Sequence, residues 1–364
     1  MFKQLGNIKA KLFAEITSIP EILQPSHLPG LDGLRGLSII IVVLGHLIWA
    51  DNLKFFIGYF GVDIFFVISG FLITTLLLKE KVKTGAISLK NFYLRRVLRI
   101  MPLAYLYLLT LVILNAIFKL NITSGSFTTA ALYLKNIPFK NSQDWYTGHF
   151  WSLSIEEQFY LMFPVLLVLY KNKYVFIVIS IILLIKISEF VAFNSSITES
   201  NKLLHYVVFG IVDIFGNGTI EILIGSLTSL LLFKQIIKFD RIRVNYWISS
   251  IILVGAFFIN AFFYENILTS IIFSVGISFV ILNNLYRRNF LGLIFNNTLL
   301  VKIGILSYSI YIWQQLFTLY QPWTKSFNYS DSIILNLVAL GIVVFLSYYL
   351  FERYFLKMKN KIVR

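Results

Sequence analysis

The stretch LDGLRGLSIIIVVLGHLIWA (residues 31–50) places two basic side chains, Arg35 and His46, at the ends of an apolar run. They are eleven positions apart, which in an α-helix is about three turns and a rise of about 16 Å. Both would therefore lie on one helix face, with Arg35 at a membrane surface and His46 near the middle of the bilayer. The chain has only four histidines, so a buried one in line with an arginine needs an explanation.

The composition is typical of a membrane protein. Of the 364 residues, 58% are hydrophobic and 13% charged, whereas a soluble domain carries about 25% charged residues. Apolar stretches of about 20 residues recur along most of the chain, which indicates an all-α, polytopic transmembrane helical bundle of about ten spans. We expect these spans near residues 34–50, 55–78, 101–119, 150–170, 174–193, 212–233, 245–263, 266–284, 303–320 and 332–352.

The distribution of lysine and arginine indicates a topology with both termini in the cytoplasm. Segments expected on the cytoplasmic side carry 25 of the 32 Lys and Arg residues, as the positive-inside rule requires. Residues 1–30 lack the apolar core of a secretory signal and are expected to stay cytoplasmic, where an interfacial helix could form. Residues 31–356 then form one transmembrane domain and 357–364 a basic cytoplasmic tail. The net charge of +15 is explained by topology and anionic lipid, so no nucleic-acid partner is expected.

Several classes of chemistry are excluded by missing residues and motifs. The absence of cysteine rules out disulfides, thiolate metal sites and a cysteine nucleophile. No GxSxG, P-loop, HExxH or paired-Asp motif occurs, which argues against a serine hydrolase, an ATP-driven pump and a metal-dependent sugar transferase. We therefore expect no metal and no permanently bound cofactor.

The ionisable residues within the spans are the candidates for chemistry, because a charge in hydrocarbon is costly. A buried neutral imidazole at His46 suits a general base, although a hydrogen bond between helices would explain it equally well. Lys186 and Glu189 are three residues apart and can compensate each other as a structural pair. Asp63 can serve in helix packing or in chemistry, and the roles of two further acids stay open: Asp213 and Glu221.

A second constraint comes from GHFWSLSIEEQFYLMFPVLL (148–167), which opens the expected fourth span from the outer face. Glu156 would lie roughly 9 Å below the outer boundary, and His46 roughly 14 Å below it in a core about 30 Å thick. These levels differ by about one helical turn, so the two side chains could flank one site. Ser152 and Glu156 share one side of this helix and Ser154 and Glu157 another.

The most basic loop ends in NFYLRRVLRIMP (91–102), where Pro102 suits the first turn of the third span. Arg96 and Arg99 are three residues apart and share a helical face. Guanidinium groups bind phosphates through two parallel hydrogen bonds, so with Arg35 they could cradle a phosphate-rich cytosolic ligand. A simple positive-inside anchor is the competing interpretation.

Taken together, these stretches resemble the acyltransferase family 3 of integral membrane proteins, which O-acylate surface glycans and other exported molecules. The resemblance covers essentially the whole chain and rests on five stretches in the expected order. They are LDGLRGLSIIIVVLGH (31–46), GVDIFFVISGFLI (61–73), FYLRRVLRIMP (92–102), FWSLSIEEQFYL (150–161) and LSYSIYIWQQ (306–315).

This resemblance implies about ten helices in the cytoplasmic (inner) membrane, a cytosolic acyl-CoA donor, expected to be acetyl-CoA, and a glycan acceptor on the far side. It points to His46 and Glu156 as catalytic residues. It also implies three donor-binding arginines, Arg35, Arg96 and Arg99, and acceptor or oxyanion contacts from Trp151 and Ser152. Gln314 stands where many members have a histidine, and we assign it no proton-transfer role.

The predicted mechanism follows from these roles. The nucleotide end of acyl-CoA binds the arginines, and His46 either removes a proton from the acceptor hydroxyl or carries the acyl group. Some relatives add an extracytoplasmic domain; we expect none after Arg364, so delivery of the acceptor would use the membrane domain or a separate envelope-assembly partner. Two alternatives stay open: a transporter or flippase of a lipid-linked glycan or small anion, and a scaffold protein.

Overall fold

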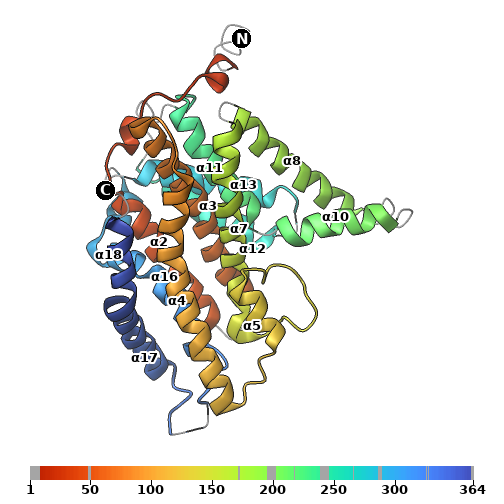
Figure 1. The fold of residues 1–364 in the computed structure, drawn as a ribbon, viewed down its shortest axis with the longest axis vertical. Coiled ribbons are helices and arrows are strands. Elements are labelled where there is room, and N and C mark those ends of the chain that lie inside the picture. The colour runs from red at the N-terminus through yellow and green to blue at the C-terminus, as the bar shows by residue number, and fades with distance from the viewer. Residues whose placement is uncertain are drawn as a thin grey trace. The chain divides into compact units, whose positions relative to one another are not determined.

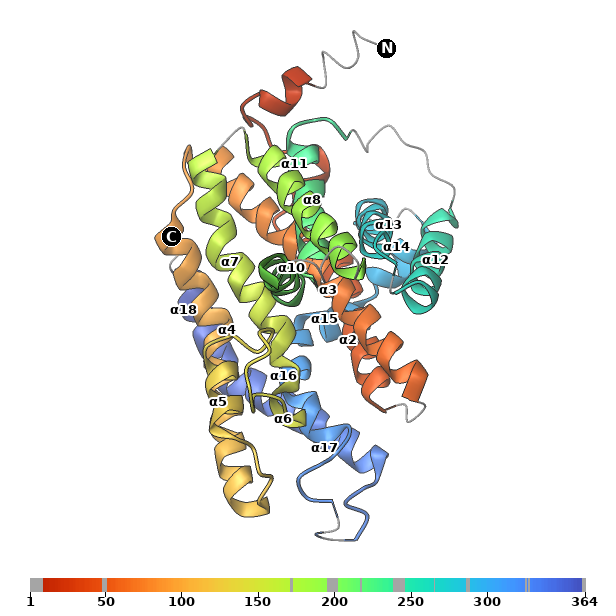
Figure 2. The ribbon, with the colours of Figure 1, turned by 90° about the vertical axis from the view of Figure 1, so that its right-hand side faces the viewer.

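The computed structural model describes residues 9–47, 51–170, 173–194, 202–216, 218–237, 246–264, 266–285, 289–324, 326 and 328–361 (Figures 1 and 2). These residues form helices and connecting segments without a strand, which confirms the all-α class. Parts of five expected segments lie outside them: 1–8, 48–50, 217, 245 and 362–364. The helices are η1 (Glu21–Leu23), α2 (Pro29–Leu47), α3 (Asp51–Thr84), α4 (Leu89–Phe118), α5 (Ser124–Ala131), α6 (Trp145–Gly148), α7 (Phe150–Tyr170), α8 (Tyr174–Phe193), α10 (Lys202–Phe215), α11 (Thr219–Phe233), α12 (Ile248–Phe262), α13 (Thr269–Asn284), α14 (Phe290–Phe295), α15 (Thr298–Ile305), α16 (Ser307–Phe317), α17 (Ile333–Leu346), η4 (Ser347–Glu352) and α18 (Arg353–Lys361).

Six of the described helices are long and apolar enough to cross a membrane, so the chain is a multi-pass membrane protein. A seventh is gained if α10 and α11, bent by 63° at their break, count as one. The prediction of about ten spans is therefore confirmed only in part. Two expected spans are the short helices α12 and α13, of 15 and 16 residues, and a third is divided between α15 and α16. The six spans are Pro29–Leu47, Gly58–Thr84, Leu89–Phe118, Trp145–Tyr170, Tyr174–Phe193 and Ile333–Lys359.

The start of α4 differs from the sequence prediction. Ser88 caps the helix, because its hydroxyl accepts a hydrogen bond from the backbone N–H of Asn91 at 3.3 Å. Pro102 consequently lies inside α4. The prediction that it stands in the first turn of the third span was wrong. A proline has no N–H to donate, so one intrahelical hydrogen bond is missing there. The arginines before it belong to the helix, which gives them fixed positions.

The described chain divides into two compact units. Unit 1 comprises residues 1–35, 63–87 and 158–301, and unit 2 comprises residues 36–62, 88–157 and 302–364. In unit 1, α8 packs with α10 and α11, and α13 packs with α11, α12 and α14 (Figure 2). In unit 2, α4 packs with α5, α16 and α18, and α16 packs with α17.

Within unit 1, α3 and α11 approach closely because glycines stand at their contact. A Cβ atom on Gly70 would collide with the carbonyl oxygen of Ile222, and one on Gly225 with that of Val67. The Thr74 hydroxyl donates to Ser226 at 2.9 Å across this contact. Small residues thus permit the close packing of these two helices.

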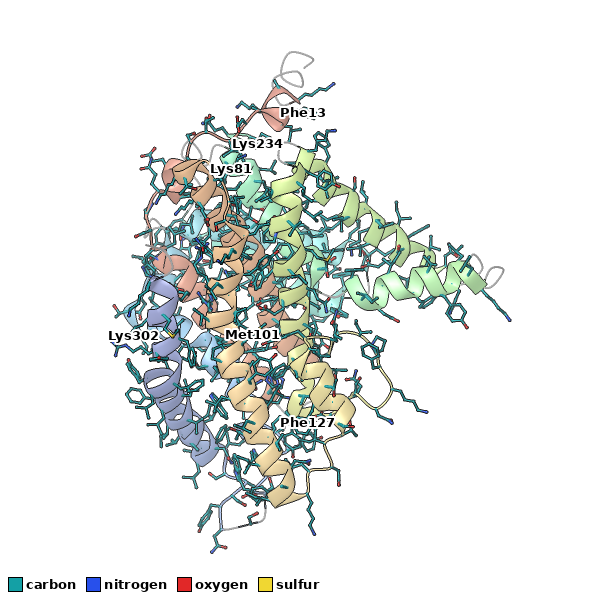
Figure 3. The ribbon with its side chains drawn as sticks, in the orientation of Figure 1. Phe13, Lys81, Met101, Phe127, Lys234 and Lys302 are labelled. Carbon is teal, nitrogen blue, oxygen red and sulfur yellow. The ribbon has the colours of Figure 1, made fainter. Side chains whose placement is uncertain are left out.

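The N-terminal segment of unit 1 is held by contacts with the rest of the unit. Lys234 Nζ donates to the carbonyl of Ala14 at 2.5 Å, and Lys81 Nζ lies 4.0 Å from a Glu15 carboxylate oxygen. Phe13, labelled with both lysines in Figure 3, stacks on Phe176 with ring centroids 5.0 Å apart. These contacts fix the segment that precedes α2.

Candidate functional site

His46 lies in the last turn of α2 and is half-buried. Its Nδ1 atom is 2.8 Å from the carbonyl oxygen of Val42. A carbonyl can only accept, so Nδ1 carries the hydrogen, and in the neutral ring Nε2 is left with a free lone pair. The helix begins at Pro29, five residues before the expected start, so His46 stands close to its far end and not near its middle.

Trp145 provides one wall beside His46. The two rings meet edge to face with centroids 5.6 Å apart. Trp145 Nε1 donates to the Gln315 carbonyl at 3.0 Å, and Gln315 Nε2 donates to the Trp145 carbonyl at 2.7 Å. Gln314 in turn donates to Gln315 Oε1 at 3.0 Å. The two glutamines of α16 thus hold Trp145 in place, which gives Gln314 a structural contact.

His149 is a buried histidine that the sequence analysis did not single out. The rings of Tyr107, Phe150 and Tyr311 surround it, with centroids 5.2, 4.9 and 5.6 Å away. Neither ring nitrogen makes a hydrogen bond of normal geometry, although the backbone of Ile312 is nearby. His149 also interacts electrostatically with His46. The low number of histidines in the chain was the only sequence signal for His149.

Ser152 lies in a small hydroxyl network beside His149. Its Oγ atom is 2.5 Å from the hydroxyl of Tyr311. Both hydroxyls are within hydrogen-bonding distance of the His149 carbonyl, Tyr311 at 3.0 Å and Ser152 at 3.2 Å. Trp151, the other predicted contact residue, packs its ring on Tyr59 at 5.4 Å. The structure thus places the two predicted neighbours in different surroundings.

The two carboxylates of α7 are not equivalent, as their spacing predicted. Glu157 has one buried oxygen without a hydrogen-bond partner and interacts electrostatically with Arg96. Glu156 interacts with the Tyr311 hydroxyl, on the side of His149. The His46 hydrogen bond goes to Val42, so the orienting role of Glu156 toward His46 stays a prediction.

The predicted arginines form a basic cluster on α4. Arg95, Arg96 and Arg99 all interact electrostatically with Lys359 of α18, a residue that the sequence analysis did not name. The Arg96 guanidinium lies over the Phe92 ring at 5.8 Å, and Arg99 interacts with Glu352. In unit 1, Arg35 makes an ion pair with Asp32 at 3.5 Å. The four positive charges of Arg95, Arg96, Arg99 and Lys359 form a site that an anionic ligand could neutralise.

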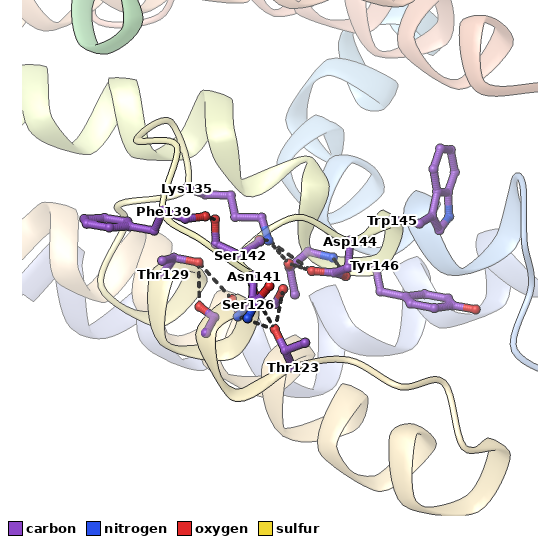
Figure 4. Close-up of polar contacts among 12 residues, drawn as sticks. Thr123, Ser126, Thr129, Lys135, Phe139, Asn141, Ser142, Asp144, Trp145 and Tyr146 are labelled. Carbon is purple, nitrogen blue, oxygen red and sulfur yellow. Dashed lines mark hydrogen bonds and ion pairs between the residues drawn. The ribbon is translucent and has the colours of Figure 1, made fainter. Parts of the chain in front are cut away.

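The segment before α7 is held by a polar network around Lys135 (Figure 4). Lys135 Nζ lies 3.0 Å from Asp144 Oδ2 and donates to Thr147 Oγ1 at 2.5 Å and to the carbonyl of Ser142. Asp144 caps α6 by accepting from the Thr147 backbone N–H at 2.8 Å. The network therefore fixes the short helix that carries Trp145 and precedes His149.

Both ionisable groups of this network have shifted pKa values. Burial would raise the pKa of the Asp144 carboxyl, but hydrogen bonds from Thr147 and the Lys135 ammonium group outweigh burial and hold it below its ordinary value. Burial lowers the pKa of Lys135, against the opposing effect of Asp144. The pair thus behaves as a buried ion pair whose charges depend on each other.

Sequence comparisons identify the family. The family model described as "Acyltransferase domain" in acyltransferase family 3 matches residues 28–352. The chain belongs to this family. A Staphylococcus aureus (strain COL) protein named "Putative O-acetyltransferase" is 33% identical over 334 residues, covering 79% of this chain and 50% of that protein. The "O-acetyltransferase OatA" of S. aureus (strain NCTC 8325 / PS 47) is 38% identical over 170 residues, covering 43% of this chain and 27% of that protein.

The chain spans about half the length of the first of these relatives and less of the second. No solved structure matches the chain. The acyltransferase family 3 assignment therefore rests on sequence, and it agrees with the multi-pass helical fold.

Proposed function

We propose that the protein is a membrane O-acyltransferase of the cytoplasmic membrane. It would move an acetyl group from cytosolic acetyl-CoA to a hydroxyl of an extracytoplasmic acceptor, a surface polysaccharide or glycolipid. The observation that carries this proposal is the position of His46 against Trp145, with Nδ1 bonded to the Val42 carbonyl so that Nε2 can accept a proton. Family membership and O-acetyltransferase relatives support the reaction class.

The donor site is proposed at Arg96 and Arg99. Acyl-CoA carries phosphate groups, and guanidinium groups bind phosphate in a bidentate manner at any working pH. Lys359 adds a fourth positive charge beside the arginines of α4. Arg35 belongs to unit 1 and remains a predicted donor contact.

The proposed chemical step uses His46 as a general base. Nε2 takes the proton of the acceptor hydroxyl, the oxygen attacks the thioester carbonyl and the C–S bond breaks. The imidazolium then returns its proton to the leaving thiolate, so the charges balance. Transfer of the acyl group through Nε2 itself is the alternative route.

The residues around His46 have subsidiary roles in this proposal. Glu156 would stabilise the imidazolium that forms during the step. Ser152, already close to the Tyr311 hydroxyl, would bind the acceptor or the developing oxyanion, together with Trp151. Membrane lipid surrounds the protein, and a separate envelope-assembly protein is proposed to deliver the acceptor.

The test measures transfer from labelled acetyl-CoA to cell-envelope glycan by the purified full chain in lipid. His46→Gln keeps a hydrogen-bonding side chain but removes the base, so turnover should fall by about 10²–10⁴-fold. The matched control is His205→Gln, because His205 is an exposed histidine of α10. A well-folded His46→Gln protein with normal turnover would contradict the proposal.

A transporter is the second candidate, and the bend between α10 and α11 favours it. Broken helices commonly form binding sites in secondary transporters. Glu221 lies in the first turn of α11, next to that break. A transporter has no reason to consume acetyl-CoA. Release of free CoA that occurs only when an acceptor is present would therefore exclude this candidate.

A further inference from the structure

Three polar side chains meet in the interior of unit 1, in a part of the chain that the proposed acyl transfer does not use. They are Asp63 of α3, Glu221 of α11 and Asn260 of α12, with exposed fractions of 7%, 5% and 4%. Asn260 Nδ2 donates to Asp63 Oδ2 at 2.9 Å, and the two carboxyl groups interact electrostatically. Three different helices therefore bring one amide and two acids together.

The hydrogen bonds of this group are incomplete. Glu221 Oε2 and Asn260 Oδ1 are both buried and have no hydrogen-bond partner. Both atoms are acceptors as they stand, and a buried acceptor without a donor is costly. A hydrogen on Glu221 Oε2 would turn one of these two acceptors into a donor.

The described side chains nearest to this group do not compensate its negative charge. On α8, Lys186 interacts with Glu221, but its Nζ is bonded to Glu189 at 2.7 Å, so these two charges cancel. The helices α12 and α13 contain no charged residue, and Glu221 is the only one in α11. Among the described side chains of α3, the charged one nearest to Asp63 is Lys79, sixteen residues away or about 24 Å along the helix.

Two ionised carboxylates cannot both remain in such surroundings. Burial disfavours the charged form of each, and each charge disfavours the other. The close packing of α3 on α11 at Gly70 and Gly225 opposes relaxation by separation of these helices. Among the described residues, no third acid, histidine or cysteine joins the two acids to complete a set of metal ligands. A single proton removes one charge and provides the missing donor.

We propose that Asp63 and Glu221 together bind one exchangeable proton, with Asn260 as the third member of the site. The amide of Asn260 donates to Asp63 and so favours the ionised form there, which leaves the proton on Glu221. Buried carboxyl groups that take up and release protons are the working parts of proton relays in membranes. The site is independent of the acyl-transfer proposal.

Infrared spectroscopy of the full chain in lipid tests the proposal directly. The wild-type protein should show a protonated-carboxyl C=O band at neutral pH that disappears reversibly as the pH is raised. Glu221→Gln, a neutral isostere of the protonated acid, should abolish the band. Glu189→Gln is the matched control, because Glu189 is ion-paired with Lys186, and it should keep the band. Absence of the band in folded wild type, or its persistence in both Glu221→Gln and Asp63→Asn, would overturn the proposal.

Thermal unfolding of the same proteins gives a second measurement. Wild-type stability should fall as the pH rises through the titration of the pair, because the second negative charge then becomes buried. Glu221→Gln should lose this dependence, while Glu189→Gln should retain it at a lower overall stability. Stabilisation by sodium over choline at constant ionic strength, without the carboxyl band, would overturn the proton site in favour of a metal cation.

Discussion

Each unit buries a pair of ionisable side chains, and the two pairs differ in a way that separates structure from function. In unit 2, Lys135 and Asp144 carry opposite charges, lie 3.0 Å apart and share hydrogen bonds with Thr147. In unit 1, Asp63 and Glu221 are both acids, and a buried Glu221 oxygen has no hydrogen-bond partner. The charges of the first pair compensate each other, so we call it a completed pair. The second pair has neither a compensating charge nor all of its hydrogen bonds, so we call it an incomplete group.

This difference gives a rule for sorting the polar residues of the chain. Lys186 and Glu189 compensate each other at 2.7 Å, as the sequence predicted, and need no ligand. The arginines around Lys359 outnumber the acids near them, Glu157 and Glu352, which suits a site for an anion. Both buried ring nitrogens of His149 lack a hydrogen bond of normal geometry, so His149 belongs with the incomplete groups. Completed pairs should affect stability, and incomplete groups should affect binding or turnover.

The largest effect is expected from breaking the completed pair in unit 2. Lys135→Met leaves Asp144 as a buried charge without its cation, which should destabilise the protein by about 3–5 kcal/mol. Thermal unfolding in detergent measures this loss. Lys140→Met is the matched control, because Lys140 is exposed, and it should change stability by less than about 0.5 kcal/mol. Equal effects of the two substitutions would show that the pair is not a structural element.

The same pair should respond to acid. Since the pKa of Asp144 is lowered in the folded protein, the unfolded chain binds the proton more readily. The ionised Asp144 contributes its full stabilisation above the pKa of an aspartate in the unfolded chain, about 3.9. This stabilisation is lost as the pH falls through the lowered pKa of Asp144 in the folded state. The difference in melting temperature between wild type and Asp144→Asn should therefore shrink in this acid range. Parallel pH profiles would contradict this sign.

The basic cluster should affect donor binding and leave folding intact. Arg96→Ala and Arg99→Ala should each raise the apparent KM for acetyl-CoA by an amount equivalent to about 1.5–3 kcal/mol, the range for hydrogen bonds to charged groups. Lysine at either position should rescue only part of the loss, because it cannot form two parallel bonds. Lys90→Ala, an exposed change on the same helix, is the control. Unchanged donor kinetics in both alanine variants would make the arginines topology anchors.

The helix contact that keeps Asp63 near Glu221 can be tested through its glycines. Gly70→Ala places a methyl group on the carbonyl oxygen of Ile222 and should cost about 1–3 kcal/mol. Gly255→Ala is the matched control, because no atom lies within 4 Å of the added Cβ. The control should gain about 0.5–1 kcal/mol, since alanine favours a helix over glycine. A neutral Gly70→Ala would show that α3 and α11 can separate, which would remove one premise of the proton site.

Sequence patterns predicted the helical class and the compensated pair, but not every helix boundary. Long apolar runs identify α4 and α8, because hydropathy alone decides that such segments can cross a membrane. Hydropathy does not show that the helices α12 and α13 end before they reach the length of a span. It also does not show that α15 and α16 are separate helices. Pro102 was placed at a helix start by local preference, yet the Ser88 cap begins α4 earlier.

The site was predictable only where a single segment carries the signal. The arginine spacing on α4 is such a case, since helical periodicity places Arg96 and Arg99 on one face. His149 was missed because its aromatic neighbours Tyr107 and Tyr311 come from α4 and α16, far away in the sequence. The Asp63–Asn260 hydrogen bond likewise joins residues that are 197 positions apart.

The smallest effect is expected from Trp145, where the completed and incomplete groups of unit 2 meet. Trp145→Phe removes the indole donor to the Gln315 carbonyl but keeps an aromatic ring beside His46. The loss of one buried hydrogen bond should cost about 0.5–1.5 kcal/mol. Gln315→Met removes the reciprocal bond to the Trp145 carbonyl. A double-mutant cycle should therefore show coupling between the two positions, because the effects of substitutions in one network are not additive.

Turnover by Trp145→Phe should remain close to wild type, since His46 keeps its bond to Val42 and its unprotonated Nε2 atom. Complete loss of turnover in a stable Trp145→Phe protein would place the indole N–H in the reaction itself and move Trp145 to the incomplete groups.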